Sequence, residues 1–555
     1  MTDPALTAKL DELFKPWNRS DAPGFVVGVA RRGELLYRRG FGLASIEHAR
    51  ANTAHTRMRI GSTSKHFCAL GILLLADAGK LDLDRPVRDI LPDLGGSAGE
   101  PTLRQLLHHT GGVRDPLYAM LFINRGHFGH APAGSGRQLM SRFRERNFVP
   151  GERMVYSNAG YTLLSHVIEQ VSGLPLAEFF RQRLFAPLGM HDTALWPSDL
   201  DIAPNLATFH MPQPGGGWRR GIYPSDELLG SGGIVSTVDD MLAWAAHLRG
   251  EHKIVGSADI WARMLERPRY NNGLEGAYSM GLMCDTYRGV QTIHHAGATM
   301  GTQCQMLVVP QHGLDIIVMS NRMDGAAPAM ADKIVDAVLE DVGLEPARTP
   351  AAADAHAALL GRWYAAASHT VMTLGRMKTA LADAPEALLL SLHHTPSALM
   401  FEVDGQLTRF AGPQEPIEIP LAAAGGDVPS MKVTLAGTVE TFTRMSETPP
   451  AAATLAPALC GRYRDAEFGI DVEIALHDDK LVLDFLPLYG HARWELAPFS
   501  DDVLGCGRFD ASPAMPLPMF GTLSMAREAG KVRGFWLNAD RVRHAWFARE
   551  DAQPK

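Results

Sequence analysis

The stretch Gly61-Ser62-Thr63-Ser64-Lys65-His66-Phe67 carries a serine and a lysine three residues apart. The apolar run that follows, FCALGILLLADA at 67–78, predicts a helix buried inside a domain. On such a helix the i, i+3 spacing places Ser62 and Lys65 on one face, at the N-terminal end. A lysine whose pKa is lowered by burial and positive surroundings can take the proton of a serine that attacks a carbonyl. By itself S-x-x-K arises about twice by chance in a chain this long, so a helix cap followed by a surface lysine is the competing interpretation.

A second candidate element is Tyr156-Ser157-Asn158. It follows a Pro-Gly turn at 150–151 and precedes the periodic run YTLLSHVIEQV at 161–171, which predicts a helix. The three residues are therefore expected on a short loop that enters a helix. The phenol of Tyr156 could relay protons near Lys65, and the amide of Asn158 can both accept from and donate to a substrate amide. Taken alone, a packed tyrosine and a turn asparagine explain the same pattern equally well.

A third candidate element is His295-Ala296-Gly297-Ala298. The runs TQCQMLVV at 302–309 and LDIIVM at 314–319 follow it and predict a β-hairpin. Gly297 would let a ligand approach the backbone closely, and the amide of Ala298 could join that of Ser62 in an oxyanion hole. A lone H-x-G means little, so this element counts only together with the other two.

Length and composition limit the class of protein. The 555 residues predict two to four domains, and 46% hydrophobic with 21% charged residues is ordinary for a soluble globular protein. A net charge of −8 gives no electrostatic reason to expect nucleic acid or an anionic membrane as partner. The five scattered cysteines suggest neither a disulfide framework nor zinc, and we expect no metal and no cofactor. Residues 1–17 suggest an amphipathic helix rather than an export signal, and with no run of about 20 apolar residues this predicts a cytoplasmic protein.

The three elements resemble, in order and in spacing (about 90 and then about 140 residues), the motifs of the penicillin-recognising serine hydrolases. The phrases TLRQLLHHTGG at 102–112 and GSGGIVST at 230–237 resemble that family too. The resemblance implies a serine β-lactamase or penicillin-binding-type catalytic domain, an antiparallel sheet flanked by helices. His295 stands where the family usually has a lysine. Because histidine is mostly neutral at pH 7, this departure favours an esterase, amidase or aminopeptidase over an enzyme that anchors a substrate carboxylate.

The C-terminal third shows a repeat. Two linkers, PARTPAAA at 346–353 and TPPAAA at 448–453, are each followed by a similar phrase, LGRWY at 360–364 and CGRY at 460–463. Short strand-like runs broken by turns then predict an antiparallel sandwich or barrel in each unit. The predicted organisation is a catalytic domain at 1–345 and two β-barrel domains at 357–447 and 458–555.

A serine hydrolase domain followed by two such modules resembles the D-aminopeptidases, the D-stereospecific branch of the same family. The resemblance implies a multidomain α+β protein with two eight-stranded antiparallel barrels, a homodimer, and an acyl-enzyme mechanism that removes N-terminal D-amino acids from short peptides or amides. It also implies β-lactams as inhibitors and a loop at 486–495 of the last barrel that reaches into the catalytic cleft. The implied catalytic residues are Ser62, Lys65 and Tyr156, and the implied substrate-binding residues are Asn158, His295, Gly297, Ala298, Tyr489 and Arg493. The loop carries His491 and Arg493 where family loops supply an acid, a departure that bears on the preference for D-aminoacyl substrates.

Four alternatives remain open from the sequence. The first is a broad-specificity esterase or amidase without D-preference, and the second is a β-lactamase or D-Ala carboxypeptidase-like activity. The third is a catalytically silent binding protein that kept the fold. The fourth is a metal-dependent hydrolase using His108, His109, His294 or His295, but these lack the H-E-x-x-H or comparable ligand spacing.

Overall fold

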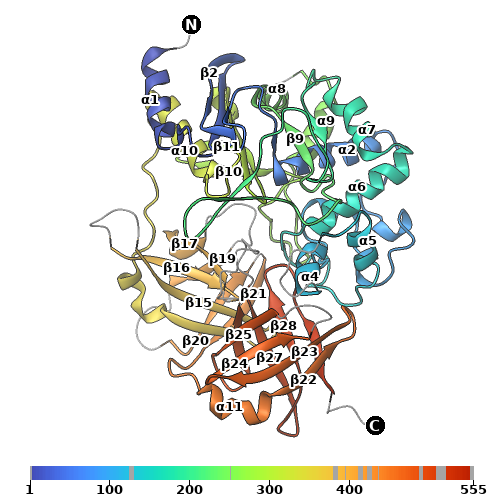
Figure 1. Ribbon diagram of the computed structural model, residues 1–555, viewed down its shortest axis with the longest axis vertical. Helices are drawn as coiled ribbons and strands as arrows, with labels where there is room; N and C mark the ends of the chain where they lie inside the picture. The colour runs from blue at the N-terminus through green and yellow to red at the C-terminus, as the bar shows by residue number, and fades with distance from the viewer. Residues whose placement is uncertain are drawn as a thin grey trace.

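The computed structural model describes residues 3–550, with gaps at 124–129, 251, 379–384, 394, 410–416, 422–427, 436, 487–491 and 508–519. Its N-terminal part combines an antiparallel sheet with helices, and two closed eight-stranded antiparallel barrels follow (Figure 1). The barrels touch each other, since the Tyr364 hydroxyl donates to Ser524 Oγ (3.3 Å). The expected class, α+β followed by two antiparallel barrels, is confirmed.

The main sheet has six antiparallel strands in the order β10-β11-β12-β13-β1-β2. Their bounds are β1 (Phe25–Arg31), β2 (Glu34–Phe41), β10 (Met283–Tyr287), β11 (Val290–Thr299), β12 (Thr302–Val309) and β13 (Leu314–Ser320). The predicted hairpin at 302–309 and 314–319 is the pair β12 and β13. Every residue of β13 is buried because helices cover both faces of the sheet: Ile317 and Met319 belong to the core under α8, and Ile316 and Val318 to the core under α1 and α10.

The helices divide between the sheet and a separate helical region, which lies on the right of Figure 1. Their bounds are α1 (Pro4–Phe14), α2 (Lys65–Asp77), α3 (Leu103–Leu107), α4 (Pro116–Ile123), α5 (Ser135–Met140), α6 (Asn158–Ser172), α7 (Leu176–Phe180), α8 (Val238–Arg249), α9 (Ala258–Met264) and α10 (Ala327–Val338). The helix predicted at 67–78 is α2, which packs against α6 and α9 and is buried along most of its length, as its apolar sequence requires. The helix predicted at 161–171 is α6. Each begins two or three residues earlier than predicted, and those extra residues include the candidate site residues Lys65 and Asn158.

Short strands complete the N-terminal part in small separate sheets. They are β3 (Leu43–Ser45), β4 (Arg50–Ala51), β5 (Met58–Arg59), β6 (Ala194–Leu195), β7 (His210–Pro212), β8 (Trp218–Arg220) and β9 (Ile234–Ser236). Strand β9 matters for the site because it holds the segment before α2: the amide of Ile60 donates to the carbonyl of Ile234 (3.0 Å).

The first barrel closes through β14 and β21, and the second through β22 and β29. The strands of the first are β14 (Gly361–Ala365), β15 (Thr370–Met377), β16 (Ala387–Leu392), β17 (Thr395–Val403), β18 (Gln406–Arg409), β19 (Ile417–Pro420), β20 (Ser430–Leu435) and β21 (Thr438–Arg444). Those of the second, which follow α11 (Ala452–Leu459), are β22 (Gly461–Asp465), β23 (Ile470–His477), β24 (Lys480–Phe485), β25 (Ala492–Pro498), β26 (Val503–Gly507), β27 (Phe520–Glu528), β28 (Lys531–Ala539) and β29 (Ala545–Arg549).

The repeated phrase has the same structural role in both barrels. Trp363 in the first and Tyr463 in the second are fully buried, and each donates a side-chain hydrogen bond to the carbonyl four residues earlier (3.0 and 2.6 Å). An arginine on the closing strand, Arg444 or Arg549, lies over that ring at 4.4 or 5.8 Å. In each barrel the repeated phrase therefore lies where the first strand pairs with the last, and its aromatic ring packs under an arginine of the last strand.

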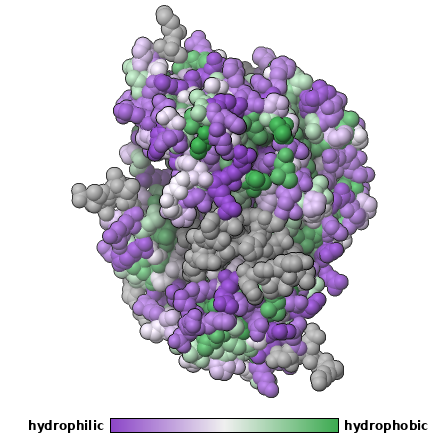
Figure 2. Space-filling model, viewed as in Figure 1, coloured by the Kyte–Doolittle hydropathy of each residue, from purple (hydrophilic) through white to green (hydrophobic). Residues whose placement is uncertain are grey.

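The visible surface is consistent with apolar residues being collected in these cores. On the face shown in Figure 2 hydrophilic residues predominate, and hydrophobic ones are scattered between them. Within the described ranges, none of the helices combines the length and the apolar character needed to cross a bilayer.

Candidate active site

Ser62 lies in a 3-10 turn, Gly61–Ser64, that leads directly into α2. Strand β11 lies against this turn at two glycines. A Cβ on Gly61, whose φ is +55°, would come within 2.6 Å of the Ala298 amide nitrogen, and one on Gly297 within 1.8 Å of the Ile60 carbonyl oxygen. The Thr63 hydroxyl also donates to the His295 carbonyl (3.2 Å). The close approach that only glycine permits therefore brings the Ala298 backbone beside the serine.

Lys65 is fully buried, and its Nζ lies near three oxygens. These are Asn158 Oδ1 at 2.9 Å, the Ser231 carbonyl at 2.6 Å and Ser62 Oγ at 3.1 Å. The first two can only accept hydrogen bonds, so they take two N–H groups of the amine. Ser62 is the only hydroxyl of the three. In the neutral amine the remaining lone pair is therefore directed to the one partner that has a proton to give.

The surroundings of Lys65 favour this neutral form. Burial lowers the pKa of the amine well below its ordinary value, and the nearby Arg541 guanidinium lowers it further. Asp115 and Cys68 act in the opposite direction but do not offset these effects. A lysine in this state can act as a general base near neutral pH.

Tyr156 covers the amine from another side. Its ring centroid lies 4.9 Å from Lys65 Nζ, and the ring is held by His109, whose centroid is 4.2 Å away. Its buried hydroxyl makes no hydrogen bond to any residue that the structure describes. Burial raises the pKa of the phenol, and the neighbouring Ser62 hydroxyl lowers it in part. Tyr156 is therefore a protonated phenol beside Ser62.

Asn158 is the first residue of α6, and the local sequence fixes it there. The Ser157 side chain caps the helix by accepting from the Ala159 amide (3.2 Å), and the Asn158 amide donates to the fully buried carboxylate of Asp115 (2.9 Å). Because Oδ1 of Asn158 is occupied by Lys65, the Nδ2 group is the part of this side chain left for a ligand.

His295 is fully buried on β11 and uncharged. Burial lowers its pKa to about 3, with Lys65 as the next cause. Its Nδ1 lies 2.5 Å from the Ala296 carbonyl, which can only accept, so Nδ1 carries the proton. Its Nε2 must then accept from the Tyr278 hydroxyl, 2.8 Å away. The histidine in the usual lysine position therefore supplies no positive charge to the site.

The structure thus brings together Ser62, Lys65, Tyr156, Asn158, His295, Gly297 and Ala298. Tyr489, like half of the loop expected to enter the cleft, lies outside the described residues. Arg493 is on β25, where its exposed side chain pairs with Asp484 of β24 (2.7 Å). None of its described contacts is with the residues around Ser62.

Sequence reasoning missed a different contribution from the last barrel. The turn at 540–544, between β28 and β29, docks on the catalytic domain and carries Arg541. The guanidinium carbon of Arg541 lies 5.0 Å from the Tyr156 ring centroid and 5.1 Å from that of Tyr118. The Asp115 amide donates to the Arg541 carbonyl (3.1 Å). The sequence of this turn carries no signal for such a role, because the role depends on how two domains dock.

The histidines considered as metal ligands have other partners. His108 Nδ1 lies 3.0 Å from the Tyr278 carbonyl, and His294 Nε2 lies 2.9 Å from Asp285 Oδ2. Within the described ranges, no group of three or more His, Cys, Asp or Glu side chains is placed to hold a metal ion.

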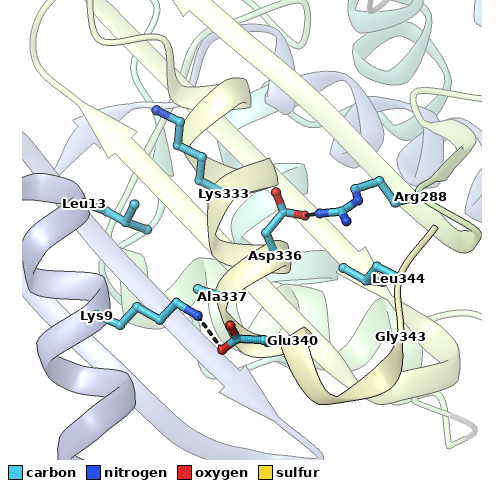
Figure 3. A pocket seen from close by; sticks show the side chains of 9 residues that line it. All are labelled: Lys9, Leu13, Arg288, Lys333, Asp336, Ala337, Glu340, Gly343 and Leu344. Carbon is cyan, nitrogen blue, oxygen red and sulfur yellow. Dashed lines mark hydrogen bonds and ion pairs between the residues drawn. The ribbon is translucent and has the colours of Figure 1, made fainter. Parts of the chain in front are cut away.

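A separate pocket of about 480 Å³ lies between α1 and the C-terminal part of α10 (Figure 3). Its two acidic residues are already paired, Glu340 with Lys9 and Asp336 with Arg288, both at 2.6 Å. None of the candidate catalytic residues lines it, so it is not the site discussed here.

Comparisons with known proteins agree with this geometry. The Beta-lactamase family model matches residues 9–340. The chain is 28% identical over 557 residues to a D-aminopeptidase of Cereibacter sphaeroides, covering 99% of this chain and 98% of that protein. A D-aminopeptidase of Brucella ovis is 29% identical over 423 residues, 73% of this chain and 77% of that protein.

Among solved structures, the octameric penicillin-binding protein homologue of Pyrococcus abyssi covers 98% of both chains with a TM-score of 0.53 and 18% identity, a likeness of fold. The likeness covers 98% of the chain, and the family match at 9–340 includes all three candidate elements. This chain therefore belongs to the Beta-lactamase family.

Proposed function

We propose that this protein is a serine hydrolase that removes N-terminal D-amino acids from short peptides or amides. The observation that carries the chemistry is the set of contacts of Lys65, which leaves one lone pair for Ser62 and two N–H groups for acceptors. The relatives named D-aminopeptidase, one of them matched over nearly the whole chain, support the substrate class.

In the proposed reaction Ser62 Oγ attacks the substrate carbonyl carbon while Lys65 takes the hydroxyl proton. The amides of Ser62 and Ala298 would stabilise the oxyanion of the tetrahedral intermediate. When the C–N bond breaks, the leaving amine receives a proton from Lys65 or Tyr156, and Ser62 keeps the acyl group as an ester. Water then attacks this ester with the same residues moving the protons, which releases the D-amino acid and restores the serine.

The other site residues would position the substrate. The free Nδ2 of Asn158 would donate to a substrate carbonyl, and Gly297 would allow the substrate backbone to lie along β11. His295 would form an uncharged wall of the cleft. This assignment draws the base from α2, the acid from the loop before α6, and the oxyanion hole from the turn before α2 together with β11.

The test joins labelling with a chiral substrate panel. Mass spectrometry after exposure to a fluorophosphonate should find Ser62 as the modified residue, and Ser62→Ala should stay unmodified. D-alanine p-nitroanilide should be hydrolysed faster than its L-form. Equal or slower turnover of the D-form would reject the D-preference, and modification at another serine would reject the site.

A broad esterase or amidase is the second candidate, favoured by the neutral His295. Short-chain ester cleavage far faster than any amide, without chiral preference, would support it instead. The homodimer, the cytoplasmic location and inhibition by β-lactams stay predictions, to be tested by light scattering, cell fractionation and penicillin acylation respectively.

A further inference from the structure

The last barrel places a cation beside the candidate catalytic residues, where the sequence motif has none. In the usual motif a lysine would stand at position 295, whereas the neutral His295 stands there in this chain. Arg541 comes to the same group of residues from the turn at 540–544, over the ring of Tyr156. Arginine stays charged at any pH that a protein tolerates.

The backbone of this turn is held rigidly by buried residues of the catalytic domain. Asn147 donates to the Arg541 carbonyl (3.1 Å) and accepts from the Arg543 amide (2.8 Å). Arg114, only 1% exposed, donates to the carbonyls of Arg543 and His544 (3.1 and 2.8 Å) and pairs with Glu467 of the same barrel (2.6 Å). The backbone at Arg541 is therefore fixed before any ligand arrives.

The side chain of Arg541, in contrast, has only long ion pairs among the described residues. Its Nε is buried, and the side chain makes no hydrogen bond to any residue within the described ranges. The nearest carboxylate oxygens lie 3.4 Å from Nε, on Asp540, and 3.9 Å from Nη1, on Asp115. Asp115 already accepts from two backbone amides, those of Leu117 and Asn158 (3.0 and 2.9 Å). The Arg541 side chain is 23% exposed and has only these two long ion pairs among the described residues, so its fork is suited to a planar anion that arrives with the ligand.

We propose that Arg541 is the carboxylate receptor of the catalytic cleft and that the preferred substrates are short peptides with a free C-terminal carboxylate. The inference rests on the proposed function and adds a binding residue for the C-terminal carboxylate of the substrate. The N-terminal D-residue is transferred to Ser62, and the carboxylate of the leaving amino acid or dipeptide pairs with Arg541. The carboxylate of a β-lactam has the same chemistry and would use the same residue.

The experiment compares D-alanyl-glycine with D-alanyl-glycinamide, which lacks only the charge. The wild type should favour the free acid roughly 10- to 100-fold in kcat/KM, as expected for a hydrogen-bonded charge pair. Arg541→Ala should abolish that preference, mainly through the KM of the free acid, and Arg541→Lys should restore part of it. Arg464→Ala is the matched control, because Arg464 pairs with Asp471 on the exposed surface of the same barrel (3.0 Å). Any general effect of Arg541 on Lys65 changes both substrates alike and cancels in the ratio.

Two further outcomes keep the inference separate from the proposed function. If D-peptides are cleaved and the preference for the free acid is the same in wild type and Arg541→Ala, the inference is overturned and the D-aminopeptidase proposal stands. If the wild type cleaves neither D-peptides nor D-alanine p-nitroanilide, the proposed function fails. Acylation of Ser62 by benzylpenicillin and by its methyl ester then still tests the receptor. Faster acylation by the free acid, lost in Arg541→Ala, supports it, and equal rates reject it.

Discussion

Lys65 Nζ donates to Asn158 Oδ1 over 2.9 Å, which joins the first residue of α2 to the first residue of α6. The contact couples the charge of the base to the identity of the residue at 158. A neutral amide accepts a proton of the amine without stabilising its charged form as strongly as a carboxylate would.

Asn158→Asp should therefore reduce activity at neutral pH while preserving the shape of the site. The new carboxylate would raise the pKa of Lys65, so the acid limb of kcat should move to higher pH, with a loss of about 100-fold at pH 7. Asn158→Ala provides the comparison, since it removes the contact and the substrate ligand without adding charge. Superimposable pH profiles for the Asp and Ala variants would contradict the coupling.

The wild-type pH profile should be set by Lys65 and not by a histidine. Lys65 acts when deprotonated, so kcat/KM should rise as pH increases through its lowered pKa, far below 10.5. His295, with a pKa of about 3, stays neutral over the whole range and adds no step. Arg541→Met removes a positive charge that lowers the pKa of Lys65, so it should shift the rise of kcat/KM to higher pH. If the rise of kcat/KM stays at the same pH in Arg541→Met but shifts in His295→Gln, the titrating group is the histidine.

Tyr156→Phe should reduce activity without lowering the unfolding temperature. The Tyr156 hydroxyl has no hydrogen bond within the described ranges, so its loss should leave the unfolding temperature unchanged or slightly raised. Activity should fall by roughly 100- to 10,000-fold if the phenol moves protons. Tyr161→Phe is the contrast, because the Tyr161 hydroxyl donates to the Leu107 carbonyl (2.8 Å) and its removal should cost about 1 kcal/mol. Full activity in Tyr156→Phe would remove the phenol from the mechanism.

The parts of the site that the sequence predicted are those encoded locally. The S-x-x-K pair needs only the start of one helix, and the strand that carries Gly297 is marked by the hairpin that follows it. The exact start of α2 was less predictable, because the residues before it form a 3-10 turn fixed by contacts with β9 and β11.

The contribution of the last barrel could not be found in this way. Arg541 is one of two arginines in a short turn, and only the docking of two domains gives it its place over Tyr156. The carbonyl of Ser231 is similar: its segment was recognised as a family phrase, but a backbone acceptor for Lys65 has no sequence signature. In both cases the information lies in tertiary contacts and not in local pattern.

Arg114 should affect the KM of carboxylate-bearing substrates indirectly, because it hydrogen-bonds the turn that carries Arg541. Arg114→Met removes two hydrogen bonds to that turn and the ion pair of Arg114 with Glu467. The expected results are a loss of about 3–5 kcal/mol in stability and a higher KM for D-alanyl-glycine, with D-alanine p-nitroanilide affected less.

Arg249→Met is the matched control for this prediction. Arg249 pairs with the fully buried Asp315 (3.0 Å) inside the catalytic domain, so its loss should destabilise the protein by a similar mechanism without touching the barrel turn. The two variants should therefore resemble each other in thermal unfolding and differ in KM for the substrate that bears a carboxylate. If Arg249→Met raises this KM as much as Arg114→Met does, the effect comes from general loosening of the catalytic domain, and Arg114 has no special link to the cleft.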